Sequence, residues 1–244
     1  MAYRAGRHFL QIPGPSPVPD RISRAIDRAV IDHRGPDFSK LGLSVLSGMR
    51  RIFKTQSPVM IYPSSGTGAW EACLSNVLET GNQVLFYETG QFATLWKQMA
   101  DRLGIETEFL VGNWRNGVDA DRIEARLRQD TQQVIKAVCC VYHETSCGTT
   151  SDIAAVRQAI DLVGHSALLI VDSISGLASV DYEHDKWGSD VTVSGSQKDL
   201  MMPPGQGFNA LSDRALEAAK QGGSKRSYWD WQEMLTSNTS GYFP

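Results

Sequence analysis

Two apolar runs that each lead to a chemically active side chain constrain the fold of this chain most. Residues 167–171 read Ala-Leu-Leu-Ile-Val and are followed by Asp172. Residues 190–193 read Asp-Val-Thr-Val and lead through a turn of small residues to Lys198. The separation of 26 residues (198 − 172) leaves room for one connection and one more strand. An acid and a lysine after the carboxyl ends of two strands lie where open α/β sheets bind ligands.

This pair of side chains suits pyridoxal phosphate (PLP). A lysine amine can condense with the aldehyde of that cofactor. A carboxylate that faces the pyridine nitrogen favours its protonated form by opposite charge, and the protonated ring accepts electrons from a substrate carbanion. Without Lys198, a helix cap or a turn carboxylate would be the default interpretation of Asp172. We therefore predict that Lys198 and Asp172 are the catalytic residues and that PLP is the cofactor.

Strand-like and helix-like segments alternate along the whole chain. The run Val134–Tyr142 is almost continuously apolar, as in a parallel strand that is covered on both faces. The run Phe38–Lys54 has the apolar spacing of an amphipathic helix. The predicted fold class is α/β, with a mainly parallel sheet and helices on both faces. Four prolines between residues 13 and 19 predict an N-terminal arm over 1–19, followed by one large domain over 20–244.

A second motif predicts where a phosphate binds. The strand-like run Val59–Tyr62 is followed by Pro-Ser-Ser-Gly-Thr-Gly, and a helical pattern then runs to Gly81. The free backbone N–H groups and the dipole at such a helix N-terminus favour an anion. The candidates to bind the PLP phosphate are Ser65, Gly66 and Thr67. The alternative is an ordinary βα turn, because glycine-rich turns are common.

Composition and charge argue against several functional classes. The 244 residues carry a formal net charge of −3, without the clustered basic charge of a nucleic-acid surface, so we expect no nucleic-acid partner. No apolar run has the length of a membrane span, and the first residues lack the apolar core of a signal peptide. The four cysteines form no Cys-x-x-Cys pair and show no metal-ligand spacing. We expect no membrane association, no metal and a cytoplasmic protein, or a peroxisomal one in a eukaryote.

Several motifs in order resemble the class V aminotransferases, which are fold-type I PLP enzymes. The turn Ser194–Lys198, followed by Pro203-Pro204-Gly205, resembles their lysine segment. Residues 12–19 and 31–36 resemble the opening of the serine–glyoxylate and alanine–glyoxylate members. The resemblance implies a homodimer with shared active sites and small amino-acid and keto-acid substrates. It also implies ping-pong transfer of an amino group from serine or alanine to glyoxylate, which forms glycine.

The resemblance also implies cofactor contacts for individual residues. Phe92 occupies the position of an aromatic side chain that stacks on the cofactor ring. Relatives of the alanine–glyoxylate type have tryptophan there, so Phe92 can stack but lacks the indole N–H. The other implied contacts are Ile174 on the opposite ring face, Gln197 at the phosphate, Thr145 and Ser146 at the ring oxygen or the substrate, and Gly14 near the substrate.

Two alternatives remain open at this point. Cysteine desulfurase-type lyases usually have histidine stacked on the ring and before the lysine, where this chain has Phe92 and Gln197. The second alternative is a non-catalytic PLP-binding fragment. It arises because the small C-terminal domain of the resembled family, with the arginine that binds the substrate carboxylate, has no counterpart before Pro244. The chain is therefore interpreted as an N-terminal fragment of a longer protein.

Overall fold

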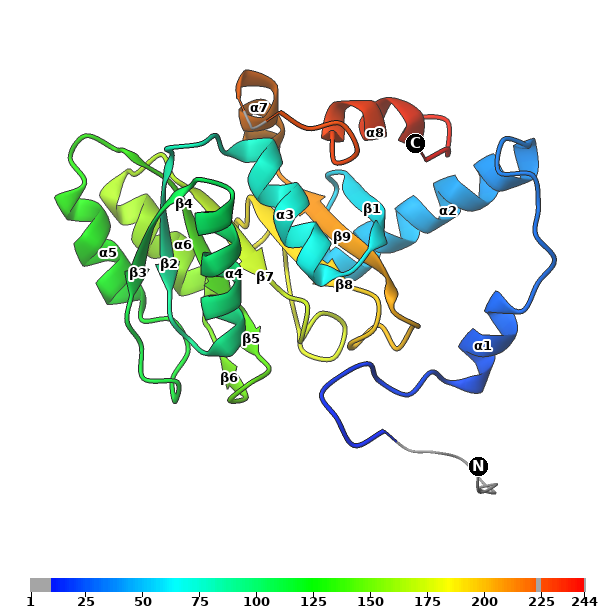
Figure 1. The fold of residues 1–244 in the computed structure, drawn as a ribbon, viewed down its shortest axis with the longest axis horizontal. Coiled ribbons are helices and arrows are strands. Elements are labelled where there is room, and N and C mark those ends of the chain that lie inside the picture. The colour runs from blue at the N-terminus through cyan, green and yellow to red at the C-terminus, as the bar shows by residue number, and fades with distance from the viewer. Residues whose placement is uncertain (1–9, 223–224, 244) are drawn as a thin grey trace.

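The computed structural model describes residues 10–222 and 225–243, so the first nine residues of the expected arm lie outside it. A seven-stranded sheet forms the centre of the molecule (Figure 1). Its strands are β1 (Val59–Ser64), β2 (Gln83–Tyr87), β3 (Glu106–Leu110), β4 (Ile135–Val141), β7 (Leu168–Asp172), β8 (Val191–Gly195) and β9 (Gly205–Leu211). A small hairpin joins β5 (His143–Glu144) to β6 (Thr149–Thr150). The helices are α1 (Asp20–Ile26), α2 (Pro36–Phe53), α3 (Gly66–Val77), α4 (Gln91–Arg102), α5 (Ala120–Gln129), α6 (Ile153–Val163), α7 (Asp213–Gln221) and α8 (Trp231–Asn238).

The order of the strands confirms the α/β class. The sheet runs β1-β9-β8-β7-β4-β2-β3, and the pairs from β8 to β3 are all parallel. Strand β9 runs antiparallel to both of its neighbours. The connection from β8 to β9 spans only residues 196–204, which is too short for the crossover that a parallel pair needs. Because the other strands are parallel, their carboxyl ends share one edge of the sheet.

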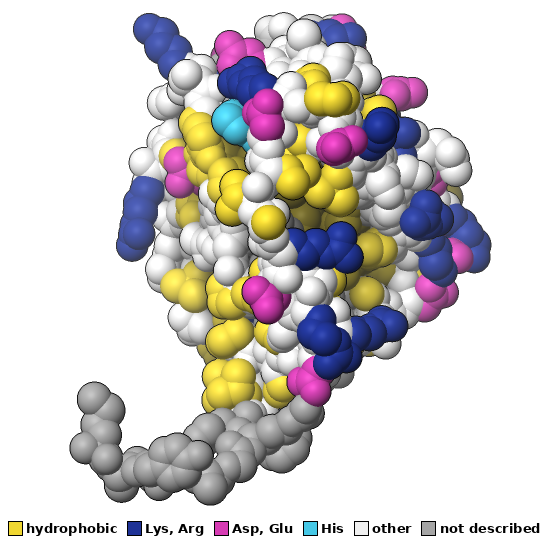
Figure 2. Space-filling model, turned by 90° about the vertical axis from the view of Figure 1, so that its right-hand side faces the viewer, with side chains coloured by type: hydrophobic (Ala, Val, Ile, Leu, Met, Phe, Trp, Pro, Cys, Tyr) yellow, Lys and Arg dark blue, Asp and Glu magenta, His cyan; other side chains and the backbone are white. Residues whose placement is uncertain are grey.

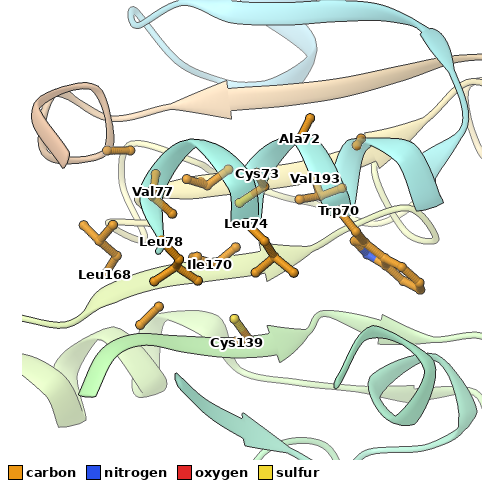
Figure 3. Close-up of a cluster of buried hydrophobic side chains, with 14 of the residues drawn as sticks. Trp70, Ala72, Cys73, Leu74, Val77, Leu78, Cys139, Leu168, Ile170 and Val193 are labelled. Carbon is orange, nitrogen blue, oxygen red and sulfur yellow. The ribbon is translucent and has the colours of Figure 1, made fainter. Parts of the chain in front are cut away.

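Helix α3 covers the middle of one face of this sheet. Its residues are buried on nearly every side, as expected for a helix inside a core rather than on its surface. Figure 3 shows Leu74 of α3 and Leu78, which directly follows this helix, beside Ile170 of β7, with Cys139 of β4 next to them. Burying one leucine side chain contributes about 1.5–3 kcal/mol. This packing fixes the direction of α3, and its first turn therefore points to the carboxyl edge of the sheet.

The opposite face is covered by α5 and α6. Ile123 and Leu127 of α5 and Val156 and Ile160 of α6 are buried in a second apolar cluster. Each of these helices begins at an aspartate whose side chain accepts backbone N–H bonds, Asp119 for α5 and Asp152 for α6. Since both faces of the sheet are covered, the carboxyl edge of the parallel strands is where side chains from several elements can meet around a ligand.

The N-terminal segment contrasts with this packed body. Figure 1 shows α1 standing away from the sheet, and no residue of α1 is buried in the described structure. Leu41, Leu43 and Val45 of α2 keep 51%, 47% and 41% of their surface exposed. Figure 2 shows apolar side chains gathered on the face that carries these two helices. None of the helices within the described ranges is both long and apolar enough to cross a membrane.

Candidate active site

The carboxyl ends of β7 and β8 bring the two predicted catalytic residues to one pocket. Asp172 is the last residue of β7, and Lys198 lies three residues beyond the end of β8. The pocket also receives α3, the start of α4 and the end of β4. Its lining residues are Gly66, Thr67, Trp70, Phe92, Val141, His143, Thr145, Asp172, Ile174, Ser175, Gln197 and Lys198.

Asp172 is held from two sides. Its side chain is buried, Oδ1 accepts the backbone N–H of Ile174 at 2.7 Å, and Oδ2 accepts the indole N–H of Trp70 at 2.9 Å. Burial raises the pKa of Asp172 to about 7, while these two hydrogen bonds and the charge of Lys198 act in the opposite direction. The charge of Glu144 adds to the rise. A cation placed at this carboxyl group would therefore favour its ionised form.

Lys198 is partly buried, and its amine lies against an aromatic ring and a carbonyl. The Nζ atom lies 5.7 Å from the centre of the Phe92 ring and donates a hydrogen bond to the carbonyl oxygen of Pro13 at 3.4 Å. Burial lowers the pKa of Lys198, and the charges of Asp199 and Asp172 oppose that change. A lowered pKa increases the unprotonated fraction of the amine, which is the form that attacks a carbonyl carbon.

The N-terminal arm passes directly over the lysine turn. The N–H of Ser16 donates to the Gln197 carbonyl at 2.8 Å, and its hydroxyl donates to the Lys198 carbonyl at 2.7 Å. A β-carbon on Gly14 would lie within 3.0 Å of three side-chain atoms of Lys198. Gly14 therefore lies at the predicted catalytic lysine, and its contact with a substrate stays a prediction.

The first turn of α3 fits an anionic group. Ser65 caps the helix by accepting the N–H of Gly68 at 3.4 Å, and the first amides of a helix have no partner within it. A β-carbon on Gly66 would lie 2.3 Å from Cδ1 of Ile174, so a larger residue there would have to displace the Ile174 side chain. The side-chain oxygen of Gln197 is buried without a hydrogen-bond partner among the described residues. A half-turn of this amide exchanges its oxygen and nitrogen, so the same group can donate to a phosphate. These features fit the phosphate of PLP.

Thr145 and Ser146 do not share one environment. Thr145 lines the pocket, and its hydroxyl lies 2.6 Å from the hydroxyl of Ser175. Ser146 is exposed and is not among the pocket-lining residues. Its hydroxyl donates to Glu144 at 2.7 Å and accepts the N–H of Gln91 at 3.0 Å. Ser146 is thus engaged at the start of α4, because the buried Glu144 carboxylate holds its hydroxyl there.

Sequence reasoning missed two residues of the site, Trp70 and Glu144. The fully buried carboxylate of Glu144 accepts the N–H groups of Phe92 and Ala93, each at 3.3 Å, at the N-terminus of α4. Glu144 thereby fixes the turn that carries the Phe92 ring. Trp70 lies four residues after Gly66 and therefore on the same face of α3, which is the signal that places it at the site.

The donor set of the pocket is not that of a metal centre. No group of three or more histidine, cysteine, aspartate or glutamate side chains within residues 10–222 and 225–243 could hold a metal ion. The pocket instead combines an amine, one carboxyl group, an aromatic ring and a helix N-terminus. This combination fits a planar, phosphorylated, carbonyl-bearing cofactor.

Comparisons with known proteins agree with this chemistry. A family model described as "Aminotransferase class-V" matches residues 24–242. The serine–glyoxylate aminotransferase of Methylorubrum extorquens is 42% identical along 247 aligned positions, which cover 99% of this chain and 61% of that protein. The L-aspartate–glyoxylate aminotransferase of Paracoccus denitrificans is 39% identical, and the alignment covers 96% of this chain and 59% of that protein. The crystal structure of an alanine–glyoxylate aminotransferase from Nostoc sp. superposes with a TM-score of 0.89 at 26% identity, over 98% of this chain and 63% of that one. The chain thus spans about three fifths of the length of the curated relatives it matches.

Proposed function

The chain belongs to the class-V aminotransferase family, and on that premise we propose that it binds PLP at Lys198 and transfers amino groups to glyoxylate. The observation that carries this proposal is the convergence of Lys198, Asp172 and Phe92 on one pocket beside the first turn of α3. Because the chain spans about three fifths of the length of the matched relatives, both the activity and the cofactor are proposals that the experiment below tests.

Glyoxylate is the proposed amino acceptor. The names of the three relatives above differ in the amino donor, which is serine, aspartate or alanine, but share glyoxylate. We propose serine or alanine as the donor and glycine as the product formed from glyoxylate. L-Aspartate enters the experiment below as a third donor, since one relative is named for it.

Each side of the pocket has a proposed role toward the cofactor. PLP, when bound, supplies an electron sink for the substrate carbanion. Asp172 would hold the proton at the pyridine nitrogen, while Phe92 and Ile174 would enclose the ring from its two faces. The phosphate would lie at the first turn of α3, bound by Ser65, Gly66, Thr67 and Gln197. Thr145 would face the ring oxygen or the substrate.

Lys198 is also the proposed base and acid of the reaction. With PLP and a donor amino acid bound, the free Nζ of Lys198 would take the proton from the substrate α-carbon. That task needs an unprotonated amine, and the lowered pKa of Lys198 favours it. The carbonyl of Pro13 accepts a hydrogen bond from Nζ at 3.4 Å, so the N-terminal arm contacts the proposed base directly.

A second copy of the chain is the proposed partner. Helix α1 buries none of its residues in the described structure, and Val30 is 99% exposed. Figure 2 shows apolar side chains gathered on the face of the molecule that carries α1 and α2. Large apolar side chains gathered on an exposed face mark an interaction site. The arm and α1 would gain their missing contacts from the partner in a homodimer.

The experiment that tests the function separates cofactor binding from chemistry. The chain is loaded with PLP, reduced with borohydride and digested, and the modified peptide is identified by mass; Lys198→Ala is the control. L-Serine, L-alanine or L-aspartate is then added without an acceptor, and the visible absorbance is followed. A reducible adduct at Lys198 and loss of the visible band with one of these donors support the proposal.

Three other outcomes argue against it. An adduct that no donor converts makes the chain a cofactor-binding fragment without turnover. Release of sulfide from L-cysteine, without conversion by the three donors, favours a desulfurase-type lyase. A folded sample that forms no adduct at Lys198 contradicts the assignment of the site.

A further inference from the structure

Trp70 holds one oxygen of the carboxyl group that the proposed cofactor needs. Its indole N–H donates to Oδ2 of Asp172 at 2.9 Å, and each of the two residues exposes only 3% of its surface. The other oxygen, Oδ1, accepts the N–H of Ile174 at 2.7 Å. With both oxygens engaged by fixed donors, the carboxyl group cannot rotate freely about its last bond.

The indole itself is fixed by packing. Its ring stacks on the ring of Trp96 with 5.7 Å between centres and 12° between planes, and Phe86 meets Trp96 edge-on. Trp70 extends from the first turns of α3 at the end of the apolar cluster in Figure 3 and lines the pocket. A donor held in this way is already oriented before any ligand arrives, which is what a supporting contact of a functional site requires.

We propose that Trp70 is a positioning residue that orients the Asp172 carboxylate toward the pyridine nitrogen and keeps it ionised. The inference rests on the proposed PLP site. Its physical basis is that a hydrogen bond donated to the charged form favours that form, whereas burial disfavours it. The charged groups that face Asp172 are Glu144 and Lys198, and both remain in the variants described below. Tyr182 also interacts electrostatically with Asp172 and remains as well.

The chain contains a matched control for this contact. Trp96 is fully buried and belongs to the same aromatic stack, but its indole nitrogen has no hydrogen-bond partner in the described part of the chain. Trp70→Phe removes a buried indole N–H that donates a hydrogen bond to Asp172. Trp96→Phe removes a buried indole N–H that has no acceptor. A difference between the two variants therefore reports the hydrogen bond rather than the lost ring volume.

The first measurement needs no cofactor. The pH titration of the Asp172 carboxyl carbon is followed by ¹³C NMR in the PLP-free chain, with Asp172→Asn identifying the resonance. Trp70→Phe is expected to raise the midpoint by about one to two pH units, as for loss of a hydrogen bond to a charged group. Trp96→Phe is expected to keep the wild-type midpoint.

A third variant tests whether an N–H donor at position 70 is sufficient to keep the titration midpoint of Asp172 low. Histidine carries Nε2 at the ring position that Nε1 occupies in tryptophan, so Trp70→His retains an N–H at that place. We expect its midpoint to lie below that of Trp70→Phe. This variant also provides the comparison with wild type if the phenylalanine variant does not fold.

The second measurement adds PLP. We expect Trp70→Phe to bind PLP about ten-fold more weakly, as for loss of one hydrogen bond, and to reduce the visible circular dichroism of the bound cofactor. When Asp172 is already asparagine, Trp70→Phe should not weaken PLP binding further, because Trp70 acts through the carboxylate of Asp172.

Equal midpoints in Trp70→Phe and wild type, or equal shifts in Trp70→Phe and Trp96→Phe, would overturn the positioning role. So would an undiminished effect on PLP binding in the Asp172→Asn background. Failure of the wild-type chain to form an adduct at Lys198 would instead overturn the proposed function. The carboxyl titration does not depend on PLP, so the two failures can be told apart.

Discussion

A β-carbon on Gly14 would lie 2.6 Å from Cδ of Lys198 and 3.0 Å from its Nζ. The neighbouring atoms belong to a flexible side chain, so Gly14→Ala should displace the lysine rather than unfold the chain. We expect the free energy of unfolding to stay within about 0.5 kcal/mol of wild type. The rate of adduct formation with PLP should fall by about 10- to 100-fold, because small displacements of a reacting group are costly. Urea unfolding and borohydride trapping measure the two effects.

Gly48→Ala is the control for that exchange. Gly48 lies within α2, and the nearest atom to its added β-carbon is Nη2 of Arg51 at 3.8 Å, an ordinary contact. Alanine in a helix interior stabilises by about 0.5–1 kcal/mol relative to glycine. Adduct formation should be unchanged in this variant. Wild-type kinetics in Gly14→Ala would show that the arm moves aside and does not constrain Lys198.

Asp172→Asn separates cofactor attachment from catalysis. The amide has nearly the same shape but no negative charge to hold the ring proton, while the amine of Lys198 is untouched. We expect the variant to retain a reducible PLP adduct at Lys198 and to convert L-serine at least about 100-fold more slowly. Stopped-flow absorbance in the absence of an acceptor measures the conversion.

The exchange Asp152→Asn serves as its control, since Asp152 only caps α6 by accepting the N–H of Ala155 at 2.9 Å. Asparagine is an equally good helix cap, so the PLP adduct at Lys198 and the rate of L-serine conversion should both stay near wild type. Rapid conversion by Asp172→Asn would contradict the electrostatic role of the carboxylate.

The parts of the site that sequence reasoning placed correctly depend on local patterns. The buried strands that end at Asp172 and precede Lys198 are apolar runs, and the first turn of α3 is a run of small residues. Such patterns determine local structure within a few residues. The parallel topology then brings the strand ends together, so the pairing of Asp172 with Lys198 in one pocket was predictable.

The contacts that sequence reasoning missed join distant segments. Trp70 and Asp172 are 102 residues apart, and Glu144 reaches the start of α4 across 52 residues to Phe92. No local period encodes such a pair, because it depends on how α3 and α4 lie on the sheet. The same reason applies to Ser146, whose hydroxyl is engaged by Glu144 and by the N–H of Gln91 instead of lining the pocket.

Glu144→Gln should loosen the turn that carries the Phe92 ring. The carboxylate accepts the N–H groups of Phe92 and Ala93 and the hydroxyl of Ser146, and an amide has only one oxygen for them. We expect destabilisation by about 1–3 kcal/mol in urea unfolding. The pKa of Asp172 should also fall, since the charge of Glu144 contributes to its rise.

Glu217→Gln controls for the loss of a surface carboxylate. Its exposed pair with Lys220 spans 3.5 Å and is expected to contribute less than about 0.5 kcal/mol. If both glutamine variants unfold at the same urea concentration, Glu144 does not stabilise the start of α4.

His184 should lower the free energy of unfolding of the chain at acidic pH. Its side chain is fully buried, Nδ1 lies 2.7 Å from the hydroxyl of Thr192, and Nε2 has no partner within the described ranges. Burial lowers the pKa of His184 to about 4, whereas an unfolded histidine titrates near 6.5. Between these values the unfolded chain binds a proton that the folded chain excludes, so stability present above about pH 6.5 is lost as the pH falls toward 4.

The size of this loss can be measured by exchange of the histidine. At pH 4.5 the effect should amount to roughly 2–3 kcal/mol relative to pH 7.5. The raised pKa of Asp172 acts in the opposite direction over the same range, so wild type must be compared with His184→Gln at each pH. We expect the PLP-free variant to lose less stability than wild type between pH 7.5 and 4.5 in urea unfolding. An equal loss in both proteins would show that His184 accepts a proton in the folded chain as readily as in the unfolded one.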